Sequence, residues 1–153
     1  EVMISVVGAF FATLAASFFS HSILSIDGTS MILASTGASA MLVFGLPNSP
    51  ASQPWNLVGG NLVSAFVGVS CGLLVGNDIL ATSLAIPLAM VSMYKLRCMH
   101  PPGGATAVTA IVGGASVQNL GYAFLLIPVF FNSIIILSLA LAAGMLREKN
   151  PYE

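Results

Sequence analysis

The chain has 153 residues, of which 57% are hydrophobic and only 6% charged, and its formal net charge is −1. Soluble domains carry about 25% charged residues, so this composition excludes a fully water-facing surface, and the charge offers no basic patch for nucleic acid. We therefore expect a single transmembrane domain over residues 1–153, with the lipid bilayer as its partner.

Apolar segments follow one another along the chain, and four of them are long. Each long segment approaches the ~20 residues that cross a ~30 Å hydrocarbon core. Two further segments are shorter and rich in glycine, alanine and serine. In chain order the long segments are 2–24, 57–76, 79–94 and 122–146, and the short ones are 29–46 and 102–117. The sequence predicts an all-α integral membrane protein with six helical segments.

A weak internal repeat accompanies these segments. The motifs GASA (37–40) and GATA (104–107) match at an offset of 67 positions. The same offset places 12–28 on 79–95 and 57–76 on 124–143. We predict two three-segment repeats, about 1–78 and about 79–146. Since three crossings reverse the direction of the chain, the second repeat is expected to be inverted relative to the first, as in many transporters.

The cations form two clusters, Lys95 with Arg97 and Arg147 with Lys149. Because Lys and Arg collect in cytoplasmic loops, both clusters are expected on one side, which requires six crossings and places both termini in the cytoplasm or stroma. The alternative is that Lys95 and Arg97 line a cavity. In that case four segments span the membrane and the two short ones are re-entrant half-helices.

The stretch RCMHPPGGATA (97–107) concentrates unusual residues. Proline is tolerated in the first helical turn, where its missing N–H would be unpaired in any case. Pro101 and Pro102 are therefore expected to end one helix and to begin a short one, which ends near Gly113 or Gly114.

The start of that short helix is the first candidate for a binding site. Gly103 and Gly104 have no side chains to shield their N–H groups, and open N–H groups at the positive end of a helix favour an anion. Thr106 would add a hydroxyl one turn into the helix. Packing is the alternative, because GATA and GASA also suit close helix–helix contact.

In the first half, Ser35, Thr36 and Gly37 occupy the corresponding place, followed by Ser39 in the matching motif. Ser and Thr are good N-cap residues and would replace the prolines here. The two halves are then expected to direct two helix N-termini at one central region.

Three ionisable side chains surround the motif. His100 titrates near neutral pH, and ionisable groups inside a membrane are costly and usually functional. We expect His100 to gate anion passage or to couple protons to it, unless it caps a carbonyl. Lys95 and Arg97 either anchor the chain at the cytoplasmic surface or attract anions to the mouth of the site.

Amide side chains supply further polar candidates. Gln53, Asn56 and Asn61 either cap the third segment or project into a cavity, and Asn132 is expected to form an interhelical hydrogen bond. Paired carboxylates, a nucleophile with its base and a metal-ligand set are not visible in the sequence. We therefore expect neither an enzyme nor a cofactor nor a metal site.

Two stretches resemble the HPP family of integral membrane proteins: HPPGGATA (100–107) and SPASQPWNLVGG (49–60). The resemblance implies a domain usually described as having four transmembrane helices, with members in chloroplasts and cyanobacteria linked to nitrite transport. It thus implies a transporter or channel for a small monovalent anion, nitrite first, in a bacterial inner membrane or chloroplast envelope. Trp55 stands where many relatives are expected to carry arginine.

Two other functions fit the same composition. One is a membrane anchor or sensor module that transports nothing, and the other is a pore for a small neutral solute. The abundant small residues also permit packing between chains, so a homo-oligomer is possible.

Overall fold

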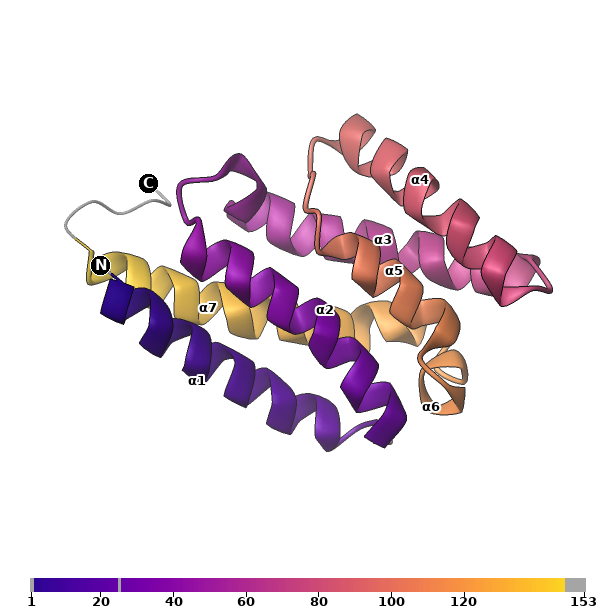
Figure 1. Cartoon of the computed structure of the whole chain (residues 1–153), viewed down its shortest axis with the longest axis horizontal. Helices are drawn as coiled ribbons and strands as arrows, with labels where there is room; N and C mark the ends of the chain where they lie inside the picture. Colours follow the sequence, from indigo (N-terminus) through magenta and orange to yellow (C-terminus); the bar gives the residue numbers. More distant parts are fainter. Residues whose placement is uncertain (1, 25, 148–153) are drawn as a thin grey trace.

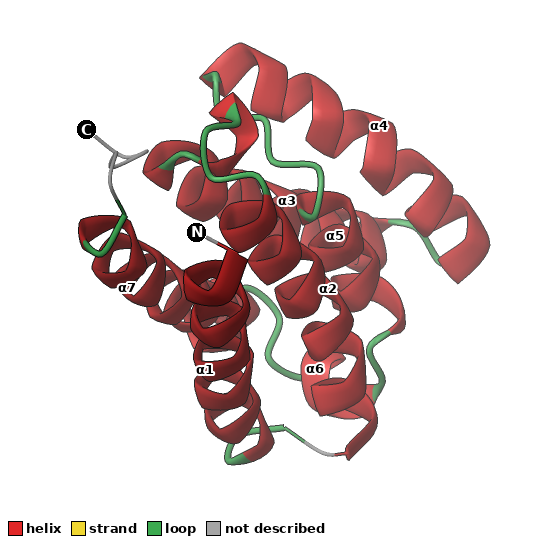
Figure 2. Cartoon of the chain, turned by 60° about the vertical axis from the view of Figure 1, so that its left-hand side comes forward, coloured by secondary structure: helices red, strands yellow, loops and turns green. Residues whose placement is uncertain are grey.

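The computed structural model describes residues 2–24 and 26–147, and these residues form helices joined by loops, without a strand among them (Figure 2). The elements are α1 (Val2–His21), α2 (Ile26–Gly45), the 3-10 turn η1 (Pro50–Ser52), α3 (Pro54–Leu74), α4 (Asp78–Leu96), α5 (Gly103–Val112), α6 (Ala115–Gln118), the π-helical turn η2 (Leu125–Phe130) and α7 (Phe131–Met145). The all-helical prediction is confirmed.

Four of these helical stretches are long and apolar enough to cross a membrane: α1, α3, α4 and the continuous η2–α7 stretch from Leu125 to Met145. They coincide with the four long apolar segments of the sequence. Local signals set several of their ends. Pro54 stands in the first turn of α3, and the Asn77 side chain caps α4 by accepting a hydrogen bond from the Leu80 N–H at 3.0 Å.

Successive helices from α1 to α5, and then η2–α7, alternate in direction along the long axis of the molecule (Figure 1). Arg147 donates to the Ser5 hydroxyl at 2.8 Å and to the Phe44 carbonyl at 3.4 Å, so the start of α1 and the ends of α2 and α7 meet. We call this the Arg147 end. The turn at Asp78, between α3 and α4, marks the opposite Asp78 end.

One basic cluster, Lys95 with Arg97, lies where α4 ends. The indole N–H of Trp55 donates to the Leu96 carbonyl at 3.1 Å and so joins the start of α3 to the end of α4. The common side of this cluster and Arg147 stays a prediction, and Lys149 lies outside the described residues.

The segment 29–46 differs from its prediction. It belongs to the 20-residue helix α2, so Ser35 and Thr36 lie in mid-helix and do not cap a helix start. The Thr36 hydroxyl donates to the Ile32 carbonyl one turn earlier, at 2.8 Å. This bond satisfies the hydroxyl within the helix, and the surrounding Ala, Met and Leu favour helix continuation. The expectation of a second helix N-terminus here was wrong.

The short helix α5 agrees with its prediction. It begins at Gly103, directly after the prolines, and its C-cap is Gly113. The preceding helix α4 ends earlier than expected, at Leu96, because Arg97 takes the left-handed conformation (φ 53°) and its N–H caps the last turn. Residues 98–100 then enter the fold without helical structure.

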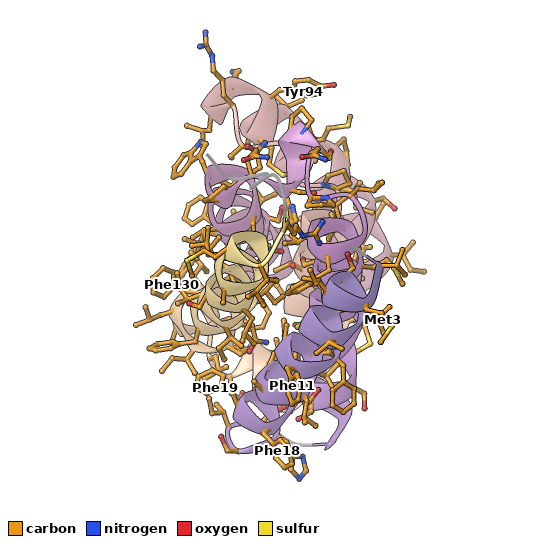
Figure 3. All side chains as sticks on the ribbon, turned by 90° about the vertical axis from the view of Figure 1, so that its left-hand side faces the viewer. Met3, Phe11, Phe18, Phe19, Tyr94 and Phe130 are labelled. Atoms are coloured by element: carbon orange, nitrogen blue, oxygen red, sulfur yellow. The ribbon has the colours of Figure 1, made fainter. Side chains whose placement is uncertain are left out.

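Apolar side chains cover much of the outside of the molecule. Met3, Phe11 and Phe18 project outward along α1, as does Tyr94 on α4 (Figure 3). Phe18 remains 70% exposed. Such a surface suits lipid rather than water. Polar side chains lie inside instead, including Ser20, Ser39, Asn61 and His100, and this inward polarity positions the candidate site.

Candidate functional site

His100 is fully buried in the connection between α4 and α5, outside the long helices. Its Nδ1 lies 2.8 Å from the Ala51 carbonyl oxygen, and its Nε2 lies 3.0 Å from the Ser39 hydroxyl on α2. Burial lowers the pKa of His100 below the usual histidine value, while the Ala51 hydrogen bond acts in the opposite direction. The neutral imidazole is therefore favoured.

A polar cluster extends inward from His100 through three helices. The Asn61 amide nitrogen on α3 donates to the Ser39 hydroxyl at 3.4 Å and to the Leu57 carbonyl at 3.0 Å. The Thr106 hydroxyl on α5 donates to the Asn61 carbonyl oxygen at 2.7 Å and also contacts the Ser35 hydroxyl on α2. Residues from both halves of the chain thus form one hydrogen-bond chain.

A second polar group faces the first from α7. The Asn132 amide nitrogen donates to the Thr36 hydroxyl at 3.2 Å and to the Ser20 hydroxyl on α1 at 2.9 Å. Ser133 is also buried, and its hydroxyl donates to the Val129 carbonyl at 2.9 Å. The predicted interhelical hydrogen bond of Asn132 is confirmed.

A small cavity of about 10 Å³ separates the two polar groups. That volume holds about one water molecule. Ser35 precedes the end of α2 at Gly45 by ten residues, or about 15 Å along a helix, which is half of a ~30 Å hydrocarbon core. The lining residues are Ile32, Ser35, Thr36, Ser39, Asn61, Thr106, Val129, Asn132, Ser133 and Ile136. None of these residues is charged.

A larger, half-open cavity of about 340 Å³ lies toward the Asp78 end, lined by residues that include Val69, Gly72, Asp78 and Gln118. An apolar cluster stands between the two cavities. Ile32 and Val129 of this cluster line the small cavity, and Val69, Ala110 and Val117 line the large one. The cluster therefore closes the central cavity on this side.

Comparison with known proteins identifies the family of this chain. Residues 1–153 match the transmembrane region of the HPP family. The chain belongs to the HPP family. The resemblance of its two motifs to that family is thereby confirmed.

Two transmembrane proteins of Dictyostelium discoideum are similar to this HPP chain. One is 39% identical over 128 residues, which cover 81% of the chain and 41% of that protein. Another is 34% identical over 126 residues, which cover 80% of the chain and 44% of that protein. The chain thus spans less than half the length of these relatives. No solved structure matches it.

The two HPP motifs pack directly against each other through glycines. A Cβ atom on Gly60 of the first motif would collide with His100 and would stand 2.7 Å from the Cys98 carbonyl oxygen. A Cβ atom on Gly103 of the second motif would stand 2.5 Å from the Ser64 hydroxyl oxygen. Both positions therefore require glycine, and the close approach holds His100 against α3.

The N–H groups at the start of α5 are not open, contrary to the prediction. The N–H of Gly103 donates to the His100 carbonyl at 2.9 Å, and that of Gly104 donates to the Pro101 carbonyl at 3.0 Å. The turn through Pro101 and Pro102 directs these carbonyls along the new helix. Pro101 is exposed and Pro102 half-buried, and neither lines the central cavity.

Several other predicted residues also lie outside the cavity wall. Gly37 lies in a groove between α1 and α2, where a Cβ atom would meet nothing within 4 Å. Lys95 and Arg97 are exposed at the end of α4.

The loop amides form connections instead of projecting into the cavity. The Gln53 side chain donates to the carbonyls of Pro47 and Ser49, both at 3.4 Å. The Asn56 side chain donates to the Met99 carbonyl at 2.9 Å and so joins the start of α3 to the His100 segment. Among the amides of the third segment, Asn61 alone lines the cavity.

Some cavity residues escaped the sequence analysis. Ser133 was detectable as the polar neighbour of Asn132 in an apolar span. Ser20, buried behind the cavity on α1, had only its polarity as a signal. Ile32 and Val129 carried no signal, because apolar residues are ordinary in membrane helices.

Proposed function

We propose that this domain carries a small monovalent anion, with nitrite first, through the central cavity. The observation that carries the proposal is the convergence of Ser35, Ser39, Asn61, Thr106 and Asn132 on one cavity at mid-depth. Hydroxyl and amide groups bind small anions by donating hydrogen bonds. The cavity of about 10 Å³ favours a small ion, because a larger substrate would require a greater displacement of the walls.

The wall chemistry favours an anion over a cation. Asp78, in the first turn of α4, lines the larger cavity and not the central one. A cation site in a protein usually gathers carboxylates and carbonyls, and the residues that line the small cavity include no carboxylate. His100 lies one hydroxyl away and supplies the nearest group that can become positive.

The proposed route enters from the larger cavity at the Asp78 end, crosses the apolar cluster around Ile32 and Val129, and reaches the central cavity. It leaves past Ser39 and His100 toward the Arg147 end, where Lys95 and Arg97 would enrich anions. Both closed sides must open in turn, as alternating access requires.

The proposal includes the inverted repeat, with six crossings and both termini on the cytoplasmic side. Under the offset, α1 corresponds to α4, α2 to α5, and α3 to η2–α7. In the first half α1 packs against α2 and against α7 of the other half, and in the second half α4 packs against α5 and against α3 of the other half. Ser39 and Thr106 correspond under the 67-residue offset and both bond Asn61. These correspondences support the repeat.

Flux measurements in proteoliposomes test the function. We expect protein-dependent uptake of nitrite, compared side by side with nitrate, formate, chloride and urea, after subtraction of protein-free vesicles. Absence of any anion flux would refute the proposal. A second candidate, a pore for a neutral solute, is favoured by the uncharged cavity wall, and uptake of urea without anions would establish it instead.

A further inference from the structure

The hydrogen-bond chain between His100 and Ser35 has a direction that its chemistry determines. A carbonyl oxygen only accepts hydrogen bonds, so His100 Nδ1, at 2.8 Å from the Ala51 oxygen, must carry a proton. In the neutral ring, Nε2 is then an acceptor. The Ser39 hydroxyl, at 3.0 Å, donates its proton to Nε2.

The remaining donors follow from this assignment. The Asn61 amide nitrogen must face the Leu57 carbonyl, which fixes its other contact as a donation to Ser39. Thr106 donates to the Asn61 oxygen, so its hydroxyl oxygen must accept from Ser35. Every proton in the chain therefore points from Ser35 toward His100, and Ser35 presents only lone pairs to the cavity. In this protonation state Ser35 therefore offers an anion no hydrogen-bond donor.

We propose that the cavity takes up its anion together with one proton, which binds His100 Nε2 and reverses the hydrogen-bond chain so that Ser35 donates to the anion. The inference rests on the proposed function. The proton comes from the aqueous solution and forms an N–H bond. Ser39 then accepts from His100 and donates to the Asn61 oxygen, after the amide has turned away from the Leu57 carbonyl. Asn61 donates to Thr106, and Thr106 donates to Ser35.

His100 is the group of this hydrogen-bond chain that can bind the proton, because its neighbours are uncharged. Its neighbours on the packed elements are Ser39 on α2, Ala51 on η1, Gly60 on α3 and Gly103 on α5. These residues are uncharged. Cys98, on its own segment, is the titratable neighbour, and burial raises the pKa of its thiol, which therefore stays neutral. The proton on His100 and the charge on the anion cancel, so each transport step moves no net charge.

Proteoliposomes that hold the whole chain test this coupling. Nitrite and nitrate fluxes are recorded with a pH dye inside the vesicles, with and without a potassium diffusion potential. Because nitrous acid crosses bilayers unaided, protein-free vesicles are subtracted, and nitrate serves as an anion that stays ionised. We expect one proton per anion, no response to the potential, and a flux that falls about tenfold per pH unit above the pKa of His100.

Variants locate the coupling. Ser39→Ala removes the hydroxyl that links His100 to the rest of the hydrogen-bond chain. His100→Gln imitates the neutral imidazole. In both variants, proton movement with the anion should disappear. Ser83→Ala removes an exposed serine on α4 that bonds only its own helix, and it should keep the one-to-one ratio. Potential-driven flux without protons, or an unchanged ratio in Ser39→Ala, would overturn the inference. Loss of all flux in the wild-type protein would refute the transport function itself.

Discussion

Ser39 and Thr106 stand 67 positions apart in the sequence (106 − 39) and bond opposite ends of one amide, the side chain of Asn61. The Asn61 nitrogen donates to Ser39, and its oxygen accepts from Thr106. An amide is the side chain that offers a donor and an acceptor on one rigid group. Asn61 therefore joins the corresponding helices of the two halves, α2 and α5, at the central cavity.

The first prediction concerns the replacement of Asn61, which joins the two halves. Asn61→Leu preserves much of the volume but removes the amide that bonds Ser39 and Thr106, so the Thr106 hydroxyl loses its acceptor. An unsatisfied buried polar group costs about 1–3 kcal/mol, so we expect a lower melting temperature in detergent together with loss of anion flux. The control is Asn119→Leu, at an exposed position on the Asp78 side. Equal behaviour of the two variants would contradict the role of Asn61.

Adjacent glycines provide a sharper comparison. A Cβ atom on Gly103 would meet the Ser64 hydroxyl oxygen and the Gly60 carbonyl, whereas one on Gly104 would meet nothing within 4 Å. Overpacking costs about 1–3 kcal/mol, so Gly103→Ala should lower the melting temperature. Gly104→Ala should leave it unchanged or raise it, because alanine favours helices. If both variants melt alike, the contact between the two HPP motifs is not tight.

The features that could be predicted from the sequence are those set by residues close together in the chain. The start of α5 directly after the prolines, the cap at Gly113 and the long apolar spans follow from a few neighbouring residues, and the structure agrees with them. The end of α4 was expected at the prolines but lies at Leu96, where Arg97 takes the left-handed conformation. Ser35 and Thr36 were misplaced because their hydroxyls fit a helix cap and a helix interior equally well. Whether they lie at a helix start or in a helix interior depends on the apolar residues on both sides.

Which residues line the cavity is decided by contacts between segments that are far apart in the sequence, so no short stretch predicts them. Asn56 and Asn61 are both polar residues on α3, yet only Asn61 reaches the cavity, because five positions along a helix change the side that a residue faces. Gly60 and Gly103 differ from Gly37 and Gly104 only through the neighbours that pack against them. Such distinctions require the position of distant segments.

The pKa of His100 predicts how stability depends on pH. Because burial lowers this pKa in the folded protein, the unfolded chain binds a proton more readily between the folded value and about 6.5, the ordinary histidine pKa. Stability should therefore fall as the pH decreases through that window. Melting temperatures in detergent at several pH values measure the effect. His100→Gln should flatten the curve in this window, and an unchanged slope would assign the effect to other groups.

The alternating helices predict the sides on which two loops are exposed. The loop between α2 and α3 and the end of α6 lie at opposite ends of the molecule (Figure 1). Asn48 in that loop and Asn119 directly after α6 are both exposed. The native Cys71 and Cys98 are buried. Asn48→Cys and Asn119→Cys should therefore react with a membrane-impermeant thiol reagent from opposite sides of oriented vesicles. Labelling of both from one side would rule out the six-crossing inverted repeat.

The apolar cluster between the two cavities predicts a variant with increased transport. Ile32 is 2% exposed, lines the central cavity and belongs to the cluster that closes it toward the Asp78 end. Removal of one methyl group in Ile32→Val costs about 0.5–1.5 kcal/mol of stability but widens the closed passage, so the rate of anion flux should rise. Ile4→Val makes the same change on α1, at the Arg147 end and outside the route, and should leave the flux unaltered. A flux in Ile32→Val equal to that of the wild-type protein would place the limiting barrier elsewhere, with the Ser39 and His100 side as the next segment to open.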